Sequence, residues 1–493
     1  MPDPNPTPSL ARHPELMRRL GALLAVAVLA ALAVLAGPTA AQAEPKDTYV
    51  IGTDTTFAPF EFTGDDGKLH GIDMDLIQAI AEDQGFEVEI RPLGFDAALQ
   101  ALQSGQVDAV IAGMTVTDER KKTFDFSDPY FTGGVQLAVP EGSDISSYEG
   151  LKGETVAVKN GTTGKEYAEE NAGKYGWTVD TYQETTDVVD AVKSGHAVGY
   201  FDDYPVIQYG ITQGSGFRTV GDPVLGGDFA MAVNKGENPE LVEAFNTGLA
   251  NLEESGKYDE IVDTYLNAEA GEQQSRDVLS VAARYWPTLV KGLGLTILAT
   301  IVAIVAAFVL GIVFGFGRIS RIAPLRWIST AYVYVFRGTP ILVQAFFVFF
   351  AIPQLLGDGF KMSPFVAGAL TLSLNTGAYM TEIIRGGIQA VDPGQTEASR
   401  SLGLGHGKTM QKVVLPQAFR IMIPSFVNQG IITLKDTSLL SVIGLAELTY
   451  QSRQIIASTY MSSQILVIVA AMYFIVITAL TLLSQRLERT YTA

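Results

Sequence analysis

The chain has no cysteine among its 493 residues. This absence excludes disulfide bonds, thiolate metal sites and cysteine nucleophiles, and we expect neither a metal site nor catalytic residues. The sequence also lacks the G-x-x-x-x-G-K-[ST] pattern that cradles nucleotide phosphates. We therefore expect this chain to bind no cofactor, and any ATP to be used by a partner subunit.

Positive charge is also scarce, since the net charge is -19 at pH 7. The shortage is confined to one part of the chain, because residues 44–283 carry a net charge of -29 and residues 284–493 carry +9. The mean hydropathy of +0.21 is nevertheless high for a soluble protein. The chain therefore joins an acidic, water-soluble part to a basic membrane part, and phosphate repulsion makes nucleic acid an unexpected partner.

The first 43 residues have the composition of a signal peptide. A basic stretch is followed by an apolar run over residues 20–35 and by the small-residue pattern Ala41-Gln42-Ala43. The alternative is an uncleaved anchor helix, although the run is short for a membrane span. In both cases residue 44 and those after it lie outside the cytoplasm.

Residues 44–268 alternate short apolar runs with amphipathic stretches. Runs such as residues 86–90 and 107–111 predict strands, and stretches such as residues 74–84 and 96–105 predict helices. This α/β pattern, without an internal repeat, indicates two lobes with a ligand cleft between them.

Four motifs occur in order within this region: Gly52–Phe62, Gly71–Leu76, Ala112–Arg120 and Phe124–Tyr130. Together they resemble the polar amino-acid-binding proteins, most closely the glutamine-binding kind, over about residues 48–268. The resemblance implies a two-lobed fold of the type II periplasmic-binding-protein class and a small polar amino acid as the ligand.

The α-carbon of such a ligand carries two charges that the pocket must match. Arg120 offers the planar fork that a carboxylate requires, although a solvated charge at a helix start is the alternative. The resemblance places the ammonium partner at Asp203, with Asp202 as the fallback. It also gives carboxylate-binding roles to four residues with suitable backbone or hydroxyl groups: Gly113, Thr115, Thr162 and Thr163.

Selectivity depends on the other end of the pocket. The resemblance implies that Asp54 accepts from a side-chain amide, that Lys159 donates to its carbonyl oxygen, and that Phe57 and Phe95 enclose the aliphatic stem. From the residue type and position alone, the core is the favoured place for each phenylalanine. Glutamate would meet like charge at Asp54, so glutamine is the preferred ligand, with asparagine or glutamate next.

Residues 269–284 read as a polar linker, and residues 285–493 as an all-α permease domain of five transmembrane helices. The expected spans are residues 293–316, 327–356, 363–384, 421–448 and 465–484. Lysine and arginine gather in the first and third loops, which places those loops and the C-terminus in the cytoplasm. The start of the first span then lies outside, where the acidic domain is expected.

The third loop, near residues 392–416, contains Glu397-Ala398-Ser399, then Gly403, then Leu415-Pro416. This spacing resembles the coupling loop of ABC-type importer permeases, which docks on a cytoplasmic ATPase subunit; an ordinary amphipathic surface helix is the alternative. The resemblance covers about residues 285–490 and implies a homodimer of this chain with two ATPase subunits.

Three ionisable residues lie within the expected spans: Arg337, Glu382 and Asp436. Charges inside a membrane are costly, so these are candidates for the translocation path, with interhelical pairs such as Lys435 and Asp436 as the alternative.

The sequence therefore predicts a multi-pass cell-membrane subunit of an ATP-driven amino-acid importer, with its binding domain outside and no enzymatic activity of its own. A ligand-gated ion channel and a transmembrane amino-acid sensor are alternatives that use the same binding fold. The channel is disfavoured because its pore interrupts the binding domain, and the sensor because it requires a cytoplasmic output domain.

Overall fold

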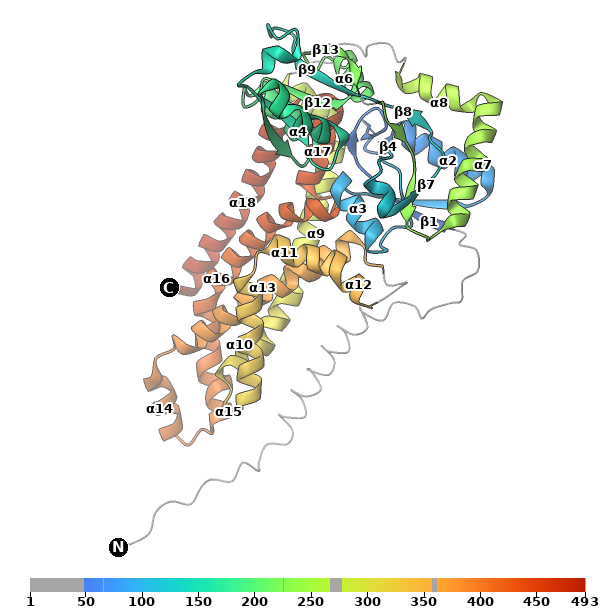
Figure 1. The fold of residues 1–493 in the computed structure, drawn as a ribbon. Helices are drawn as coiled ribbons and strands as arrows, with labels where there is room; N and C mark the ends of the chain where they lie inside the picture. The colour runs from blue at the N-terminus through green and yellow to red at the C-terminus, as the bar shows by residue number, and fades with distance from the viewer. Residues whose placement is uncertain (1–47, 65, 225, 267–276, 357–360, 493) are drawn as a thin grey trace. The chain divides into compact units, whose positions relative to one another are not determined.

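A computed structural model describes residues 48–64, 66–224, 226–266, 277–356 and 361–492. The chain divides into residues 1–45 and one compact unit, Lys46–Ala493, to which all described residues belong. Figure 1 colours this unit from blue through green to red along the sequence. The expected signal peptide and the first half of the expected linker, residues 269–276, lie outside the described residues. Residues 278–284 of that linker belong to a helix that begins at Val278.

Lobe 1 is built around a five-stranded sheet in the order β5-β1-β6-β15-β7. Its strands are β1 Thr48–Thr53, β5 Glu87–Pro92, β6 Ala109–Val110, β7 Phe124–Phe126 and β15 Ala232–Asn234. β1 pairs in parallel with β5, Thr48 opposite Glu87, and is buried from its second residue onward, as a strand covered on both faces must be. The helices of this lobe are α2 Ile72–Gln84, α3 Phe95–Gln103, α7 Pro239–Ser255 and α8 Lys257–Leu266.

Lobe 2 repeats the plan with the order β11-β10-β12-β9-β13. Its strands are β9 Val135–Pro140, β10 Thr155–Lys159, β11 Thr178–Tyr182, β12 Gly199–Asp203 and β13 Phe217–Val224. Its helices are α4 Thr163–Tyr175, α5 Thr185–Lys193 and α6 Tyr204–Thr212. Functional residues follow β10 and β12, because the carboxyl ends of strands are where α/β sheets leave side chains free to bind ligands.

Two short strands join the lobes. β8 Phe131–Thr132 precedes lobe 2, β14 Asp228–Phe229 follows it, and the two pair in antiparallel register with Phe131 opposite Phe229. The predicted two-lobed α/β domain is confirmed, and this pair is the crossing between its halves.

The remaining elements are helical. They are α9 Val278–Ile319, α10 Ala323–Gly338, α11 Ile341–Phe346, η3 Phe347–Ala351, α12 Ile352–Leu356, α13 Pro364–Gln389, α14 Pro393–Ser401, α15 His406–Thr409, η4 Met410–Val414, α16 Leu415–Asp436, η5 Thr437–Ile443, α17 Leu448–Thr459 and α18 Ser462–Thr492. Among the described residues, two helices are long and apolar enough to cross a membrane, Val278–Ile319 and Ser462–Arg486, or three if a bent pair counts as one. A helical permease region follows the binding domain, but the expected count of five spans is not confirmed.

Two of the expected spans are not single helices. The second bends by 108° between α10 and α11, because Thr339 is extended ahead of Pro340, which has no N–H to continue the helix. The fourth ends as an α-helix at Asp436 and continues as the 3-10 helix η5, which stops at Gly444 with a φ of 79°. A further helix, α17, follows where the sequence predicted only a loop.

Candidate ligand-binding site

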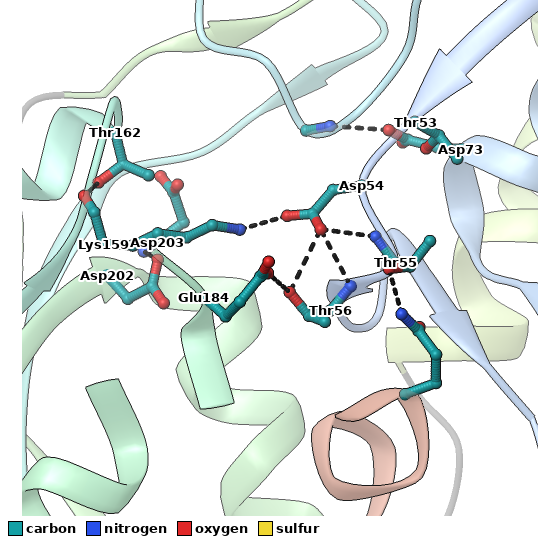
Figure 2. A network of polar contacts seen from close by, with 12 residues as sticks. Thr53, Asp54, Thr55, Thr56, Asp73, Lys159, Thr162, Glu184, Asp202 and Asp203 are labelled. Atoms are coloured by element: carbon teal, nitrogen blue, oxygen red, sulfur yellow. Dashed lines mark hydrogen bonds and ion pairs between the residues drawn. The ribbon is translucent and has the colours of Figure 1, made fainter. Parts of the chain in front are cut away.

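A small cavity lies between the two lobes. All ten residues that the sequence predicted for ligand binding line it, together with Ala112: Asp54, Phe57, Phe95, Ala112, Gly113, Thr115, Arg120, Lys159, Thr162, Thr163 and Asp203. The structure thus brings together residues from α3, α4, β10, β12 and from segments between these elements, such as Asp54 directly after β1. Figure 2 shows the polar part of this site.

Arg120 occupies one end of the cavity and touches both lobes. Its Nη1 donates to the carbonyl oxygen of Thr115 at 2.5 Å in lobe 1, and its Nη2 donates to that of Gly161 at 2.7 Å in lobe 2. Burial lowers the pKa of Arg120, although Glu166 and Asp203 oppose the shift. The guanidinium carries five N–H donors, so the fork retains donors for a ligand carboxylate.

Gly113 lies beside this end with a backbone that only glycine adopts easily. Its φ is 52°, and a Cβ there would lie 2.5 Å from the ring of Phe57. Its N–H donates at 2.8 Å to Oδ2 of Asp73, which also accepts from the hydroxyl of Tyr130 at 2.8 Å. Asp73 therefore already accepts from the backbone N–H that the sequence assigned to the carboxylate, and Gly113 lines the cavity without presenting that donor to it.

Thr162 and Thr163 approach from lobe 2 at the start of α4. The Thr162 side chain caps the helix by accepting from the N–H of Lys165 at 3.3 Å, and it donates to the carbonyl oxygen of Lys159 at 2.8 Å. Helix N-termini present free N–H groups and a positive dipole end, which favour an anion.

Asp203 lines the cavity, whereas Asp202 does not. Asp203 ends β12 directly before α6, while the side chain of Asp202 turns back to accept from the N–H of Asp203 at 2.9 Å. Burial raises the pKa of Asp203 well above its ordinary value, repulsion from Asp202 adds to the rise, and Arg120 and Lys159 oppose it. A cationic group beside Asp203 would restore its charge.

The opposite end of the cavity is a buried ion pair between the lobes. Lys159 of β10 donates through Nζ to Oδ2 of Asp54, and both side chains are almost fully buried. The other oxygen of Asp54 accepts from the N–H of Thr55 at 2.6 Å and the hydroxyl of Thr56 at 3.2 Å. Burial works to lower the pKa of Lys159, but Asp54 and Glu184 outweigh it, so the amine stays charged.

Glu184 is a residue of this end that the sequence analysis missed. Its Oε2 accepts from the hydroxyl of Thr56 at 3.2 Å, across the lobes, and Figure 2 shows it beside the Asp54–Lys159 pair. Burial raises the pKa of Glu184 to about 7, Asp54 adds to the rise, and Lys159 and Arg453 oppose it. Glu184 directly precedes α5, and no local motif marks it.

Phe57 and Phe95 are both buried on the wall between the two ends. The Nζ of Lys159 lies 5.4 Å from the ring centroid of Phe57 and 5.8 Å from that of Phe95. The guanidinium of Arg120 lies 5.5 Å from the Phe95 ring. The rings therefore separate the two polar ends with apolar surface.

The candidate path residues of the helical region have different surroundings. Glu382 pairs with Arg318 of α9 at 3.1 Å and with Arg385 at 2.7 Å, as an interhelical pair would. Arg337 lies 5.0 Å over the ring of Tyr379. Asp436 ends α16 next to Lys435 and, within the described residues, forms no ion pair with it.

The candidate coupling loop forms a helix–turn–helix. Glu397 and Ala398 lie in α14, Gly403 makes the turn with a φ of 85°, and Leu415 and Pro416 begin α16. The hydroxyl of Ser399 donates to that of Thr409 at 3.0 Å and ties the two short helices together.

Comparison with known families finds two matches along the chain. Residues 49–268 match the bacterial extracellular solute-binding proteins, family 3. Residues 307–491 match the binding-protein-dependent transport system inner membrane component.

The permease relatives agree with the second match. The arginine transport system permease protein ArtQ of Bacillus subtilis is 39% identical over 203 residues, which are 41% of this chain and 92% of that protein. The glutamine transport system permease protein GlnP of Escherichia coli is 38% identical over 203 residues, with the same coverage. Substrate-binding domain 2 of Lactococcus lactis GlnP, solved in an open conformation, is 43% identical, covers 46% of this chain and 98% of that domain, and has a TM-score of 0.37.

Proposed function

We propose that this chain, which belongs to the binding-protein-dependent transport system inner membrane components and carries a fused family 3 solute-binding domain, captures glutamine outside the cell membrane for import. It is the fused binding and permease component of an amino-acid ABC importer, and it is not an enzyme. Its binding domain is extracytoplasmic, and an ABC ATPase is its partner.

One observation carries the choice of glutamine: the Asp54–Lys159 pair at the far end of the cavity. A carboxamide presents an N–H₂ donor and a carbonyl acceptor on one planar group. Asp54 can accept from the first while Lys159 donates to the second. At the near end, Arg120 and Asp203 match the α-carboxylate and α-ammonium that all amino acids share.

The same pair disfavours charged side chains. A glutamate carboxylate facing Asp54 would meet like charge, and a cationic side chain would meet Lys159. Arginine is the second candidate, because Glu184 adds a carboxylate at this end and one relative is named for arginine transport. Asparagine is shorter and would reach the pair less well than glutamine.

The membrane part completes the proposal. We propose a signal peptide over residues 1–43, a binding domain over 44–268, a linker over 269–284 and a permease domain over 285–493. Its five spans are α9, the bent α10–α12, α13, α16 and α18. α13 and α16 have 26 and 22 residues, and at 1.5 Å per residue about 33 Å or more suffices to cross about 30 Å of hydrocarbon.

Coupling is proposed to run through the loop near residues 392–416. Two copies of this chain assemble with two ATPase subunits, the ATPase uses the ATP, and α14 with Gly403 docks on it. Closure of the two lobes on the ligand is a hinge motion, and its contacts with the ligand supply the free energy that favours the closed state.

Uptake of labelled glutamine tests this function. The chain and its ATPase, reconstituted in liposomes, should accumulate glutamine only with ATP, and excess unlabelled glutamine should compete while excess arginine should not. Uptake without ATP, or uptake of arginine in preference to glutamine, would contradict the proposal. A mass measurement of the purified complex tests the two-copy assembly separately.

A further inference from the structure

The two lobes meet the helical region through contacts of different extent within the compact unit. Lobe 1 shares a hydrophobic core with it. Buried side chains of lobe 1, such as Leu93 and Val50, belong to one continuous cluster with Phe349, Met362 and Leu445. At Gly444 an added Cβ would lie only 2.7 Å from the Leu93 side chain, so the fit there is close.

Polar contacts around this shared core are also well paired. Lys361 forms an ion pair with Asp108 at 2.9 Å, and the N–H of Met362 donates to the side chain of Gln106 at 2.9 Å. In α17, Gln454 accepts from the hydroxyl of Thr63 at 3.2 Å. Well-packed apolar surface with satisfied polar groups is typical of lasting interfaces.

Gln454 also reaches the wall of the ligand site. Its side-chain amide donates at 2.5 Å to the hydroxyl of Thr55, the residue directly after Asp54. The helix α17 therefore touches the loop that carries the selective end of the cavity.

Lobe 2 meets the turn after α17 through one aromatic side chain and a few polar contacts. Tyr460 packs against the buried hydrophobic cluster of lobe 2 that includes Ile207 and Phe217. Lys193 donates to the carbonyl oxygen of Tyr460 at 3.0 Å and lies 5.4 Å over its ring, and the hydroxyl of Ser462 donates to Asp190. An open groove of about 1410 Å³ lies alongside, lined by residues of both parts. Tyr460 has a φ of 58°, which is uncommon for a residue with a side chain, so the turn presents it in a defined way.

We infer that lobe 1 stays docked on the permease throughout, and that the turn Tyr460–Ser462 detects closure by engaging lobe 2 only when it has swung onto lobe 1. The inference rests on the proposed function, because it assigns the fixed and the moving half of the same binding domain. In the described part of the chain the backbone passes between the lobes at β8 and β14. The contacts around the cavity, such as Lys159 with Asp54, are made by side chains, so lobe 2 can move without disturbing the shared core. The segment from α17 to Ser462 then contacts lobe 1 throughout and lobe 2 only when the lobes are closed.

Paired cysteines test this inference with little background, because the chain has no cysteine of its own. In the full chain, Asp190→Cys with Ser462→Cys reports on lobe 2, and Thr63→Cys with Gln454→Cys reports on lobe 1. Saturating glutamine should raise oxidative cross-linking of the lobe 2 pair at least fivefold and leave the lobe 1 pair within twofold. A lobe 2 cross-link independent of glutamine, in a chain that binds glutamine, would overturn the inference.

A second experiment, in which the lobes are closed without ligand, separates this inference from the proposed function. Thr56→Cys with Glu184→Cys, joined by a short bifunctional thiol cross-linker, would lock the lobes shut, since these side chains meet at 3.2 Å between the lobes. In the locked chain the lobe 2 pair should cross-link without any amino acid. If glutamine fails to bind but the locked chain cross-links at lobe 2, the substrate assignment fails and the inference stands; if the locked chain does not cross-link there, the inference fails.

The energetic consequence can be measured in the complex with its ATPase. Lys193→Ala with Ser462→Ala should lower glutamine-stimulated ATP hydrolysis about fivefold and change the glutamine Kd less than twofold, because neither side chain lines the cavity. The matched control is Lys235→Ala, a lobe 1 surface lysine paired with Asp125. Unchanged stimulation in the double variant would contradict a closure-detecting role.

Discussion

The two ends of the ligand cavity differ in whether backbone groups or side chains hold their binding groups in place. At the α-carbon end, Arg120 is held by backbone carbonyl groups of both lobes, and the Gly113 peptide is held by Asp73. At the far end, Asp54, Lys159, Glu184 and Thr56 contact one another through side chains. Backbone geometry changes little when a sequence varies, whereas side chains change with each substitution.

This difference separates two tasks. The α-carbon end binds what all amino acids share and owes its geometry to the fold. The far end reads the ligand side chain, and its groups can be exchanged without altering the backbone. We therefore expect substitutions at the α-carbon end to weaken the binding of all amino acids alike. Substitutions at the far end should change the order of their affinities.

The largest effect is expected for Arg120→Ala. Loss of two charge-assisted hydrogen bonds to the carboxylate should weaken every amino acid by roughly 4 kcal/mol, or about 1000-fold in Kd. Calorimetric titration of the full chain measures this, with Lys122→Ala, an exposed neighbour, as the control. A loss of affinity for glutamine alone would contradict the division between the two ends, since it would make Arg120 part of the selective end.

Asp203→Asn should follow, with a loss of about 100-fold for every amino acid, because the ammonium loses its anionic partner in a buried site. Asp202→Asn is the matched control, one residue away and outside the cavity, and should weaken binding less than tenfold. The reverse order would move the ammonium site to Asp202.

Asp54→Asn should change which amino acids bind most tightly rather than weaken the binding of all of them. Removing the negative charge leaves Lys159 free to attract a carboxylate, so the ratio of glutamate Kd to glutamine Kd should fall about tenfold or more. Competition titrations at pH 7 measure this ratio, and Thr115→Ser at the other end should leave it unchanged. An equal loss for both ligands would show that Asp54 only supports the fold.

The smallest effect concerns pH. The pKa of Glu184 is raised from 4.5 to about 7 in the folded chain, so between these values the folded state holds a proton that the unfolded state has released. Its contribution to the free energy of unfolding therefore falls as pH rises through this window, by about 2 kcal/mol after allowing for partial solvent contact.

Glu184→Gln should remove this contribution to the fall in the free energy of unfolding between pH 4.5 and about 7. Thermal unfolding of the binding domain within the full chain, compared at pH 5 and pH 8, measures it, with the exposed Glu254→Gln as the control. Asp73 and Asp202 have raised pKa values as well, so some pH dependence should remain. An identical slope in the Glu184 variant and the control would exclude Glu184 as a titrating group of the far end.

Much of the site could be predicted from the sequence, because its residues lie in local motifs. Arg120, Gly113 and Thr115 fall in one nine-residue stretch, and Lys159 and Thr162 in another, so recognising each stretch placed several lining residues at once. The register of Asp203 against Asp202 needed the structure, because only the turn into α6 shows which carboxylate faces the cavity.

Other features had no local signal. Glu184 lies beside the Asp54–Lys159 pair only because the fold brings it to Thr56, 128 positions earlier in the chain. The bend at Thr339-Pro340 lies within an apolar stretch long enough for one span, and hydropathy averages over it. The helix α17 contains polar side chains such as Gln454, which are buried where the helix packs against lobe 1. Because its sequence is not continuously apolar, the sequence analysis predicted a loop there.

The central claim is that the far end of this cavity selects a carboxamide. The most direct test is calorimetric titration of the full chain with glutamine, asparagine, glutamate, arginine and histidine, in parallel with the Asp54→Asn variant. The account predicts that glutamine binds at least tenfold more tightly than the others and that the variant loses this preference. Tighter binding of arginine or histidine, or a preference unchanged in the variant, would contradict it.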